Sequence, residues 1–304
     1  MTTMKKTLAL VMLFCITLGA QAQLLWKVSG NGLDRPSYVM GTHHLAPLSI
    51  KDSIAGMKQA MDETQQVYGE LVMENAMKPD MLMKMQQAMM LPADTTLKSL
   101  FTPAEYDSIA SVVKTYISMD LALFDKLKPA ALTTQLSVAL AAKSVKGFNP
   151  QEQLDTWFQA QAKQAGKKVG GLESMEQQID VLYRSQSLQR QAHLLYCAAT
   201  TIDYATLQAQ RMTEAYMNQD LDTLLEIMEE KQNDSCDSTP QEEDTLIFGR
   251  NANWARQMPD IMKQAPTLFV VGAGHLPSQR GLLKLLEDQT RCTSVSWPPR
   301  TPMT

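Results

Sequence analysis

Two short segments, far apart in the chain, each place histidine just after an apolar run and a glycine. In SYVMGTHH, Gly41 is followed by His43 and His44, and in TLFVVGAGH, Gly272 is followed by His275. An imidazole can bind a metal ion, or take a proton from water near neutral pH. The two segments therefore predict one shared metal-binding or proton-transfer site, the alternative being that both are ordinary core or loop histidines.

The spacing also predicts how such a site is positioned. A buried strand that ends in glycine can turn sharply, because glycine tolerates a positive φ. Open α/β sheets place their sites at the carboxyl edge of the strands. We therefore expect both apolar runs to be strands of one sheet, with Gly41 and Gly272 at their carboxyl ends and His44 and His275 at one shared edge.

Strand-like segments gather toward the two ends of the chain, and the long middle has a helical pattern. Strands are predicted at 24–30, 35–42, 267–276 and 292–297, with shorter ones at 69–74 and 167–174. Helical periodicity begins at about Ser53, with a first helix over 53–68 and a last long one over 244–266. The sequence thus predicts an α/β fold, with a small central sheet built from N- and C-terminal strands and a large helical middle region.

The first residues have the pattern of a secretory signal peptide. Lys5 and Lys6 precede the apolar run 8–19 and the small-residue site Ala20-Gln21-Ala22. A retained membrane anchor is the alternative, but the run is short for a span of roughly 20 residues. We therefore predict a signal peptide over 1–22 and a single domain over 23–304. The product is expected to be exported to the periplasm or outside the cell, and to be soluble without stable membrane insertion.

Charge and cysteine content narrow the possibilities further. The formal net charge of −4 argues against nucleic acid as a partner. Three cysteines follow the predicted signal peptide, which allows one disulfide in an oxidising compartment. Cys197 lies in an apolar helical run and is predicted to be a buried thiol, with its neighbour His193 explained by packing. The predicted bridge joins Cys236 and Cys292.

Two long stretches, LLWKVSG to SYVMGTHHLAP and GRNANWARQMPDIMKQAPTLFVVGAGHL, resemble the TraB/GumN family. That family is similar to the Tiki metalloproteases and, more distantly, to erythromycin esterase-like proteins. The resemblance covers nearly the whole chain after the predicted signal peptide, although the helical middle is not specific. It implies that the two Gly-x-x-His motifs act with a downstream glutamate, Glu70 in VYGELVM. It further implies supporting positions at Glu173 in GLE and at the pair Arg250 and Asn251.

The chain departs from the family pattern at two points. His43 stands where the family usually has an apolar residue, so it is a spare ligand or, as we prefer, a tolerated edge residue. Glu74 follows Glu70 by four residues. On a strand the two would share a face and both could reach the site. Glu70 is the preferred glutamate.

The resemblance implies a metal-dependent hydrolase, with a peptidase as the favoured form and a peptide or small molecule as substrate. His44, His275 and Glu70 are the expected ligands of a divalent ion, either Mn²⁺, Co²⁺ or Zn²⁺. Arg250 could pair with a site carboxylate or a developing oxyanion. One alternative is a metal-free, esterase-type hydrolase, in which His44 or His275 acts with Glu70 on water. The other is a protein that binds haem, a metal or a hydrophobic ligand without turnover.

Overall fold

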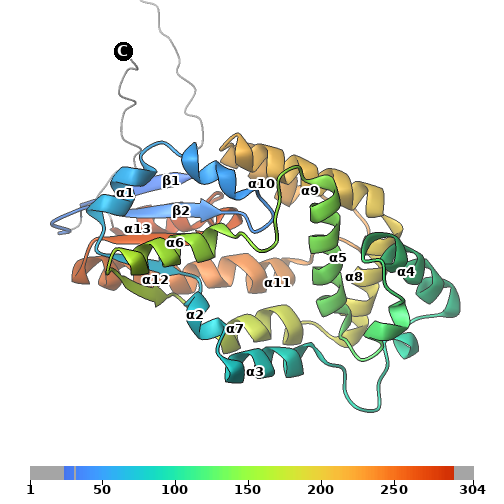
Figure 1. Ribbon diagram of the computed structural model, residues 1–304. Helices are drawn as coiled ribbons and strands as arrows, with labels where there is room; N and C mark the ends of the chain where they lie inside the picture. The colour runs from blue at the N-terminus through green and yellow to red at the C-terminus, as the bar shows by residue number, and fades with distance from the viewer. Residues whose placement is uncertain (1–23, 31, 291–304) are drawn as a thin grey trace, which may run out of the picture.

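The computed structural model describes residues 24–30 and 32–290, and a five-stranded sheet lies in one half of the molecule (Figure 1, left). The strands lie in the order β1-β2-β5-β3-β4. Their bounds are Leu25–Val28, Ser37–Thr42, Gln66–Gly69, Lys168–Gly171 and Thr267–Gly272 for β1 to β5. β2, β5, β3 and β4 run parallel, and β1 pairs antiparallel with β2. The predicted α/β class with a small sheet and a largely helical remainder is confirmed.

The strand register brings four carboxyl ends to one edge of the sheet. Thr42 of β2 pairs with Gly272 of β5, and Gly69 of β3 pairs with both Val270 of β5 and Gly171 of β4. β5 lies between β2 and β3, and its residues 267–271 are completely buried. A parallel strand covered on both faces reads as a continuous apolar run. This explains why TLFVV was recognisable in the sequence.

Helices from distant parts of the chain cover the sheet. The main ones are α1 (Met57–Glu63), α6 (Leu154–Gln164), α9 (Ile202–Met217), α10 (Leu221–Glu229), α12 (Gly249–Gln264) and α13 (Leu282–Thr290). Phe158 of α6 and Trp254 of α12 are buried in the same apolar cluster as the strand side chains. Two of these helices, α6 and α12, therefore hold side chains close to the sheet.

The remaining helices are α2 (Met73–Ala76), α3 (Pro79–Met89), α4 (Pro103–Tyr116), α5 (Pro129–Ser144), α7 (Met175–Ile179), α8 (Leu188–Thr200) and α11 (Pro240–Glu243). Among them, α3, α4, α5, α7 and α8 form a second region with its own apolar clusters, and α2 and α11 are short helices without buried side chains (Figure 1). Proline at the first helical position starts α3, α4 and α5, where its missing N–H costs nothing. Two π-helical turns, η4 (Asp180–Arg184) and η5 (Asp244–Phe248), extend α7 and precede α12.

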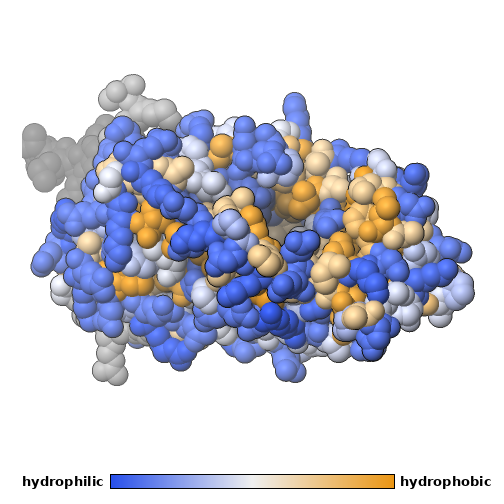
Figure 2. All heavy atoms as spheres, turned by 60° about the horizontal axis from the view of Figure 1, so that its bottom comes forward, coloured by the Kyte–Doolittle hydropathy of each residue, from blue (hydrophilic) through white to orange (hydrophobic). Residues whose placement is uncertain are grey.

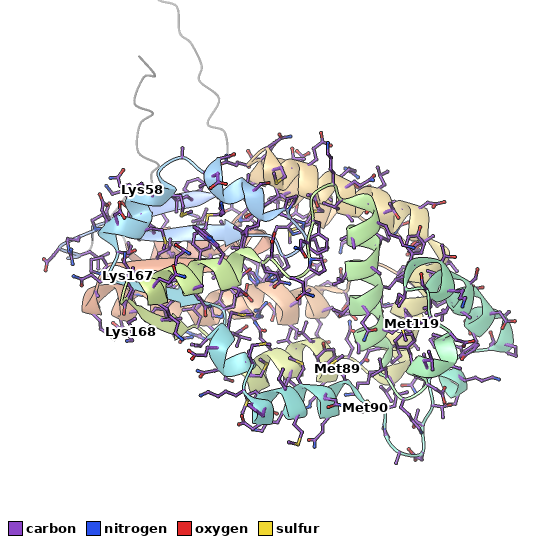
Figure 3. All side chains as sticks on the ribbon, viewed as in Figure 1. Lys58, Met89, Met90, Met119, Lys167 and Lys168 are labelled. Atoms are coloured by element: carbon purple, nitrogen blue, oxygen red, sulfur yellow. A yellow bond between two sulfur atoms is a disulfide. The ribbon has the colours of Figure 1, made fainter. Side chains whose placement is uncertain are left out.

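The three lysines and three methionines labelled in Figure 3 lie in different parts of the molecule. Lys58, Lys167 and Lys168 lie together near the start of β4, away from the carboxyl edge of the strands. Met89, Met90 and Met119 lie in the helical region. Met89 packs against a small apolar cluster, so it fills core space there. The lysines are consequently at the amino end of β4 and do not add charge to the opposite edge.

The segment that joins β2 to α3 differs from the sequence-based expectation. The predicted helix over 53–68 is shorter, because α1 ends at Glu63 and the Thr64 hydroxyl donates to the Ala60 carbonyl. The residues that follow, 66–69, form the buried strand β3 rather than a further helical turn. The predicted strand at 69–74 was therefore wrong. Glu74 lies on α2 instead.

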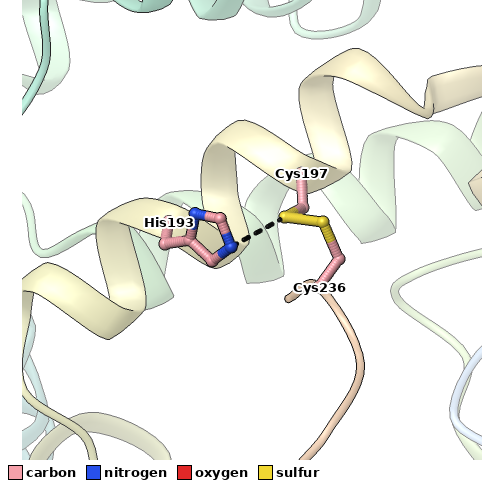
Figure 4. Close-up of side chains that lie close together, drawn as sticks. All are labelled: His193, Cys197 and Cys236. Carbon is pink, nitrogen blue, oxygen red and sulfur yellow. Dashed lines mark hydrogen bonds between the residues drawn. A yellow bond between two sulfur atoms is a disulfide. The ribbon is translucent and has the colours of Figure 1, made fainter. Parts of the chain in front are cut away.

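The predicted cysteine pairing was also wrong. Cys236 is bonded to Cys197, with the two Cα atoms 5.9 Å apart (Figure 4). Cys197 is therefore not a free thiol, since the loop after α10 carries Cys236 back to α8. Cys292, the predicted strand at 292–297 and the predicted signal peptide at 1–22 lie outside the described residues. Within the residues that the structure describes, no helix combines the length and apolarity needed to cross a bilayer.

The disulfide yields a stability prediction. The bridge closes a loop with a sequence separation of 39. In the chain-entropy model this corresponds to about 4 kcal/mol. We expect the double variant Cys197→Ser, Cys236→Ser to lower the free energy of unfolding in urea by roughly that amount. The matched control Cys292→Ser should unfold like the unmodified protein. A Cys236–Cys292 peptide in mass spectra of unreduced digests would contradict the pairing.

Candidate active site

The carboxyl edge of the sheet collects the side chains that the sequence singled out. His43 and His44 follow β2, His275 follows β5, and Glu70 follows β3 directly. Glu173 comes two residues after β4. These residues are distant in sequence and are brought together because four parallel strands end at one edge.

The two motif glycines are required for close packing rather than for an unusual backbone. Neither glycine has a positive φ. The predicted sharp turn at each strand end is therefore not the reason that glycine occurs there. A Cβ atom on Gly41 would lie 3.0 Å from the Ala273 Cα, in the neighbouring motif. One on Gly272 would lie 3.3 Å from Glu70 Oε1. Glycine therefore lets the two motifs and Glu70 approach one another.

Arg250, on α12, joins the carboxylates at this edge. Its Nη2 donates to Glu70 Oε2 at 2.6 Å and to Glu173 Oε1 at 2.5 Å, and its Nε donates to Glu173 Oε2 at 3.2 Å. Its guanidinium lies 4.7 Å from the ring centre of Trp254, which is a cation–π distance. The side chains of Arg250 and Glu70 are each 12% exposed, and that of Glu173 is 5% exposed. This is a nearly buried ion triad.

His275 is held by hydrogen bonds on both ring nitrogens. Arg250 Nη1 lies 3.1 Å from its Nε2, and Asn251 Oδ1 lies 2.7 Å from its Nδ1. Because a guanidinium can only donate, Nε2 accepts and Nδ1 carries the proton toward Asn251. Asn251 is itself fixed, since its amide donates to the carbonyls of His275 and Arg280. His275 is therefore a neutral imidazole in one orientation.

His44 has a different environment. Its Nδ1 lies 3.2 Å from Asp155 Oδ2, and its side chain is 57% exposed. Asp155 comes from α6 and is buried, with Thr42 donating to its Oδ1 at 3.0 Å. Apart from the imidazole, Asp155 Oδ2 has no hydrogen-bond partner among the described residues. Asp155 therefore orients the ring through Nδ1, while more than half of the imidazole stays exposed.

The pKa values of the two histidines move in opposite directions. Hydrogen bonding and charge attraction to Asp155 raise the pKa of His44 to about 9, against a smaller effect of burial. Burial lowers the pKa of His275 to about 4, although Glu70 acts against it. Near neutral pH the site thus holds one protonated and one neutral imidazole.

Glu70 is the carboxylate between the two motifs. Burial opposes its ionisation, but His275, Arg250 and a 2.8 Å hydrogen bond from the Gly272 N–H together keep its pKa below the ordinary value. Its Oε1 lies 3.9 Å from His275 Nε2. Glu70 therefore carries a negative charge in the middle of the site.

Two sequence candidates lie outside this cluster. Glu74 is exposed and pairs with Lys163, so it does not share a face with Glu70. His43 packs against Tyr216, with ring centres 5.5 Å apart, and burial lowers its pKa to about 4. The preference for Glu70 over Glu74 agrees with this geometry, and His43 has the contacts of a packing residue.

The ligand atoms of His44, Glu70 and His275 are not gathered as tightly as a bound ion requires. Among the described residues, one set of His, Cys, Asp or Glu side chains has ligand atoms all within 4.8 Å of one another: His193, Cys197 and Cys236. His193 Nε2 lies 3.6 Å from Cys197 Sγ (Figure 4). The two sulfurs of that set are already bonded to each other. Neither group, as it stands, is a formed metal centre.

Three residues of the site were not foreseen in the sequence. Asp155 orients His44, Trp254 lies 4.5 Å from the His275 ring centre, and Gln178 donates to Glu70 and Glu173. Asp155 and Gln178 lie in helices or helix starts with ordinary polar composition. Aspartate is rarely buried without a partner. The burial of Asp155 on α6 is therefore a signal for a functional role, and only the structure provides it.

The ion triad yields a prediction about charge. Arg250→Met should lower the free energy of unfolding by about 3–5 kcal/mol at pH 8, because two buried carboxylates lose their cation. The loss should shrink toward pH 5, since an unpaired buried carboxyl has a raised pKa and takes up a proton in the folded state. Arg184→Met is the control, because Arg184 is 46% exposed in its pairs and should cost under about 1 kcal/mol. Equal losses for both variants in urea unfolding would refute the assignment.

One known family matches most of the chain. The model of the TraB/PrgY/gumN family matches residues 24–291, which include every strand of the sheet and all the side chains described above. Comparisons with curated proteins and with solved structures gave no match. The match does not extend to Tiki metalloproteases or erythromycin esterase-like proteins, so those similarities stay predictions. The chain belongs to the TraB/PrgY/gumN family.

Proposed function

We propose that this protein is a hydrolase of amide or ester bonds and that His44 moves the proton. The observation that carries the proposal is the pair of Asp155 and His44: the carboxylate lies 3.2 Å from His44 Nδ1, and the imidazole is 57% exposed. A carboxylate that orients an imidazole is the arrangement used for general base catalysis. In the neutral form, His44 Nε2 takes a proton from water as the water oxygen attacks the carbonyl carbon. It then returns that proton to the leaving nitrogen or oxygen.

The peptide form of this proposal comes from the family resemblance noted above, and the disulfide supports a location outside the cytoplasm. The Cys197–Cys236 disulfide is a bond that persists in oxidising compartments and is rare in the cytosol. We accordingly propose that the protein acts outside the cytoplasm, on a peptide or a small molecule. Nothing in the charge pattern of the site calls for nucleic acid.

The expected divalent ion meets an obstacle in this geometry. His44, His275 and Glu70 are suitable donors for Mn²⁺, Co²⁺ or Zn²⁺ by residue type. However, Arg250 already donates to Glu70 Oε2 and lies on the Nε2 of His275. An ion bound to His275 Nε2 would have to displace a buried guanidinium. The residues do not fit an ion in this arrangement, and the metal-free form is therefore proposed first.

A metal-dependent form is the second candidate, and one distance favours it. Glu70 Oε1 and His275 Nε2 are 3.9 Å apart, less than two bonds of about 2.1 Å, so one ion could contact both atoms if Arg250 moved away. Metal quantification on the purified protein and on the variant His44→Ala, His275→Ala distinguishes the forms. Stoichiometric metal that is lost in the variant, with activity lost on chelation, would replace the metal-free proposal.

The first activity prediction concerns His44. His44→Ala should reduce kcat against a cleaved peptide or ester by about 10²–10⁴-fold, the contribution typical of a general base. Its unfolding should change little, since the side chain is half exposed. His43→Gln is the matched control, because the neighbouring histidine packs against Tyr216 and should keep activity within a few fold. Loss of activity in His43→Gln with retention in His44→Ala would reverse the assignment.

The second activity prediction concerns the pH dependence of kcat/KM. A base must be neutral to act, and the pKa of His44 is about 9, so kcat/KM should rise with pH up to about that value. Asp155→Asn keeps the size and the Thr42 contact but removes the charge that stabilises the imidazolium. The pKa of His44 should then fall toward the ordinary value of about 6.5, which moves the rise to lower pH and lowers its plateau. An unchanged midpoint in Asp155→Asn would show that another group controls the profile.

A further inference from the structure

A cavity lies between the sheet-covering helix α10 and helices α5 and α8. It has a volume of about 930 Å³ and is lined by residues of α5, α8, α10, η4 and η5 and of the loop that follows β5. The face in Figure 2 is hollowed near its middle, and apolar side chains border the hollow. Cavities of this size are typical of small-molecule sites.

The cavity reaches the candidate site through two residues. Gly274, the neighbour of His275, lines it, and so does Leu246, whose carbonyl accepts a hydrogen bond from Arg250 at 3.0 Å. Met228 packs onto Gly274 so closely that an added Cβ would lie 2.8 Å from its terminal carbon. A ligand in the cavity would therefore lie beside the His275 and Arg250 cluster.

The walls are apolar and partly uncovered. Their main side chains are Leu182, Leu194, Leu225, Met228, Leu246 and Phe248. Leu182 and Leu246 are 44% and 47% exposed, on the π-helical turns η4 and η5. Exposed apolar side chains that gather at a cavity are a feature of binding sites.

Four hydroxyls of the lining already donate hydrogen bonds within their own helices. The hydroxyls of Thr133, Thr134, Ser185 and Thr245 each donate to a carbonyl four residues earlier in their own helix. They are not free donors for a peptide main chain, whose buried polar groups would be left unpaired.

The charges of the lining also disfavour an anion. Arg190 is paired with Glu242 and Lys231 with Glu243, while Glu229 adds an exposed negative charge. With two cations paired and one acid in excess, the cavity is better suited to a neutral hydrocarbon chain than to a free carboxylate.

We infer that this cavity binds a linear hydrocarbon chain of the substrate, as in a fatty-acyl ester or amide. The chain would occupy the cavity and leave its carbonyl at the His275 end. This inference rests on the proposed hydrolase for its substrate class, but binding of the chain itself requires no turnover. It extends the proposal from a reaction type to an acyl compound.

The test measures binding of uncharged 1-alkanols, from hexanol to decanol, by calorimetry on the full chain. Affinity should rise with each CH₂ group, up to roughly fourfold per group for complete burial. Leu182→Asp should weaken decanol binding by at least about tenfold, since it places a charge in the wall. Leu207→Asp is the matched control, because Leu207 is a similarly exposed leucine, at 51%, and is not in the lining. It should bind like the unmodified protein.

Thr134→Phe provides a second test of the cavity. Thr134 is an exposed helix residue of the lining, so the larger side chain narrows the cavity without removing a core side chain. The variant should weaken decanol binding more than hexanol binding. Affinity independent of chain length, or equal losses in Leu182→Asp and Leu207→Asp, would overturn the inference. An apolar tetrapeptide that binds where alkanols do not would also overturn it. His44→Ala should bind decanol normally, so a failed hydrolase proposal and a failed cavity proposal give different results.

Discussion

The site depends on one electrostatic requirement: two buried carboxylates at neighbouring strand ends need a cation. Glu70 and Glu173 come from the ends of β3 and β4, and Arg250 reaches both from α12. Unpaired, such charges would carry a desolvation cost of several kcal/mol each. The guanidinium offsets that cost and also fixes His275 through Nε2. Helix α12 must therefore pack at one height and one rotation against the sheet, and Asn251 on the same helix turn completes the orientation of the imidazole.

This arrangement gives His275 and His44 different environments, although the two sequence motifs are similar. His275 is enclosed, neutral and bonded on both nitrogens, which is the environment of an orienting group. His44 is half exposed and paired with one carboxylate. The difference comes from the helices that cover each strand end, since α12 delivers a cation and an amide to one, and α6 delivers an anion to the other.

What could be foreseen from the sequence follows the same division between strands and covering helices. The runs SYVM and TLFVV, with their glycines and histidines, are local patterns, so β2, β5, His44 and His275 were recognisable. Glu70 and Arg250 came from a family resemblance. Asp155 could not be foreseen, because its burial depends on how α6 packs across the end of β2. The Cys197–Cys236 bond was missed for the same reason, since helix α8 and a distant loop must first meet.

The position of β5 has a consequence for how the molecule can assemble. The strand lies in the middle of the sheet, between β2 and β3, yet it is the last strand of the described chain to be synthesised. Before residues 267–272 have been synthesised, no strand lies between β2 and β3. Helix α12 then has no complete sheet edge to pack against. Contacts between residues so far apart in sequence form slowly, because loop-closure entropy is lost before they contribute. A chain that ends before residue 272 therefore lacks the central strand that brings the ends of β2 and β3 to one edge, and the candidate site cannot be assembled before that strand is inserted.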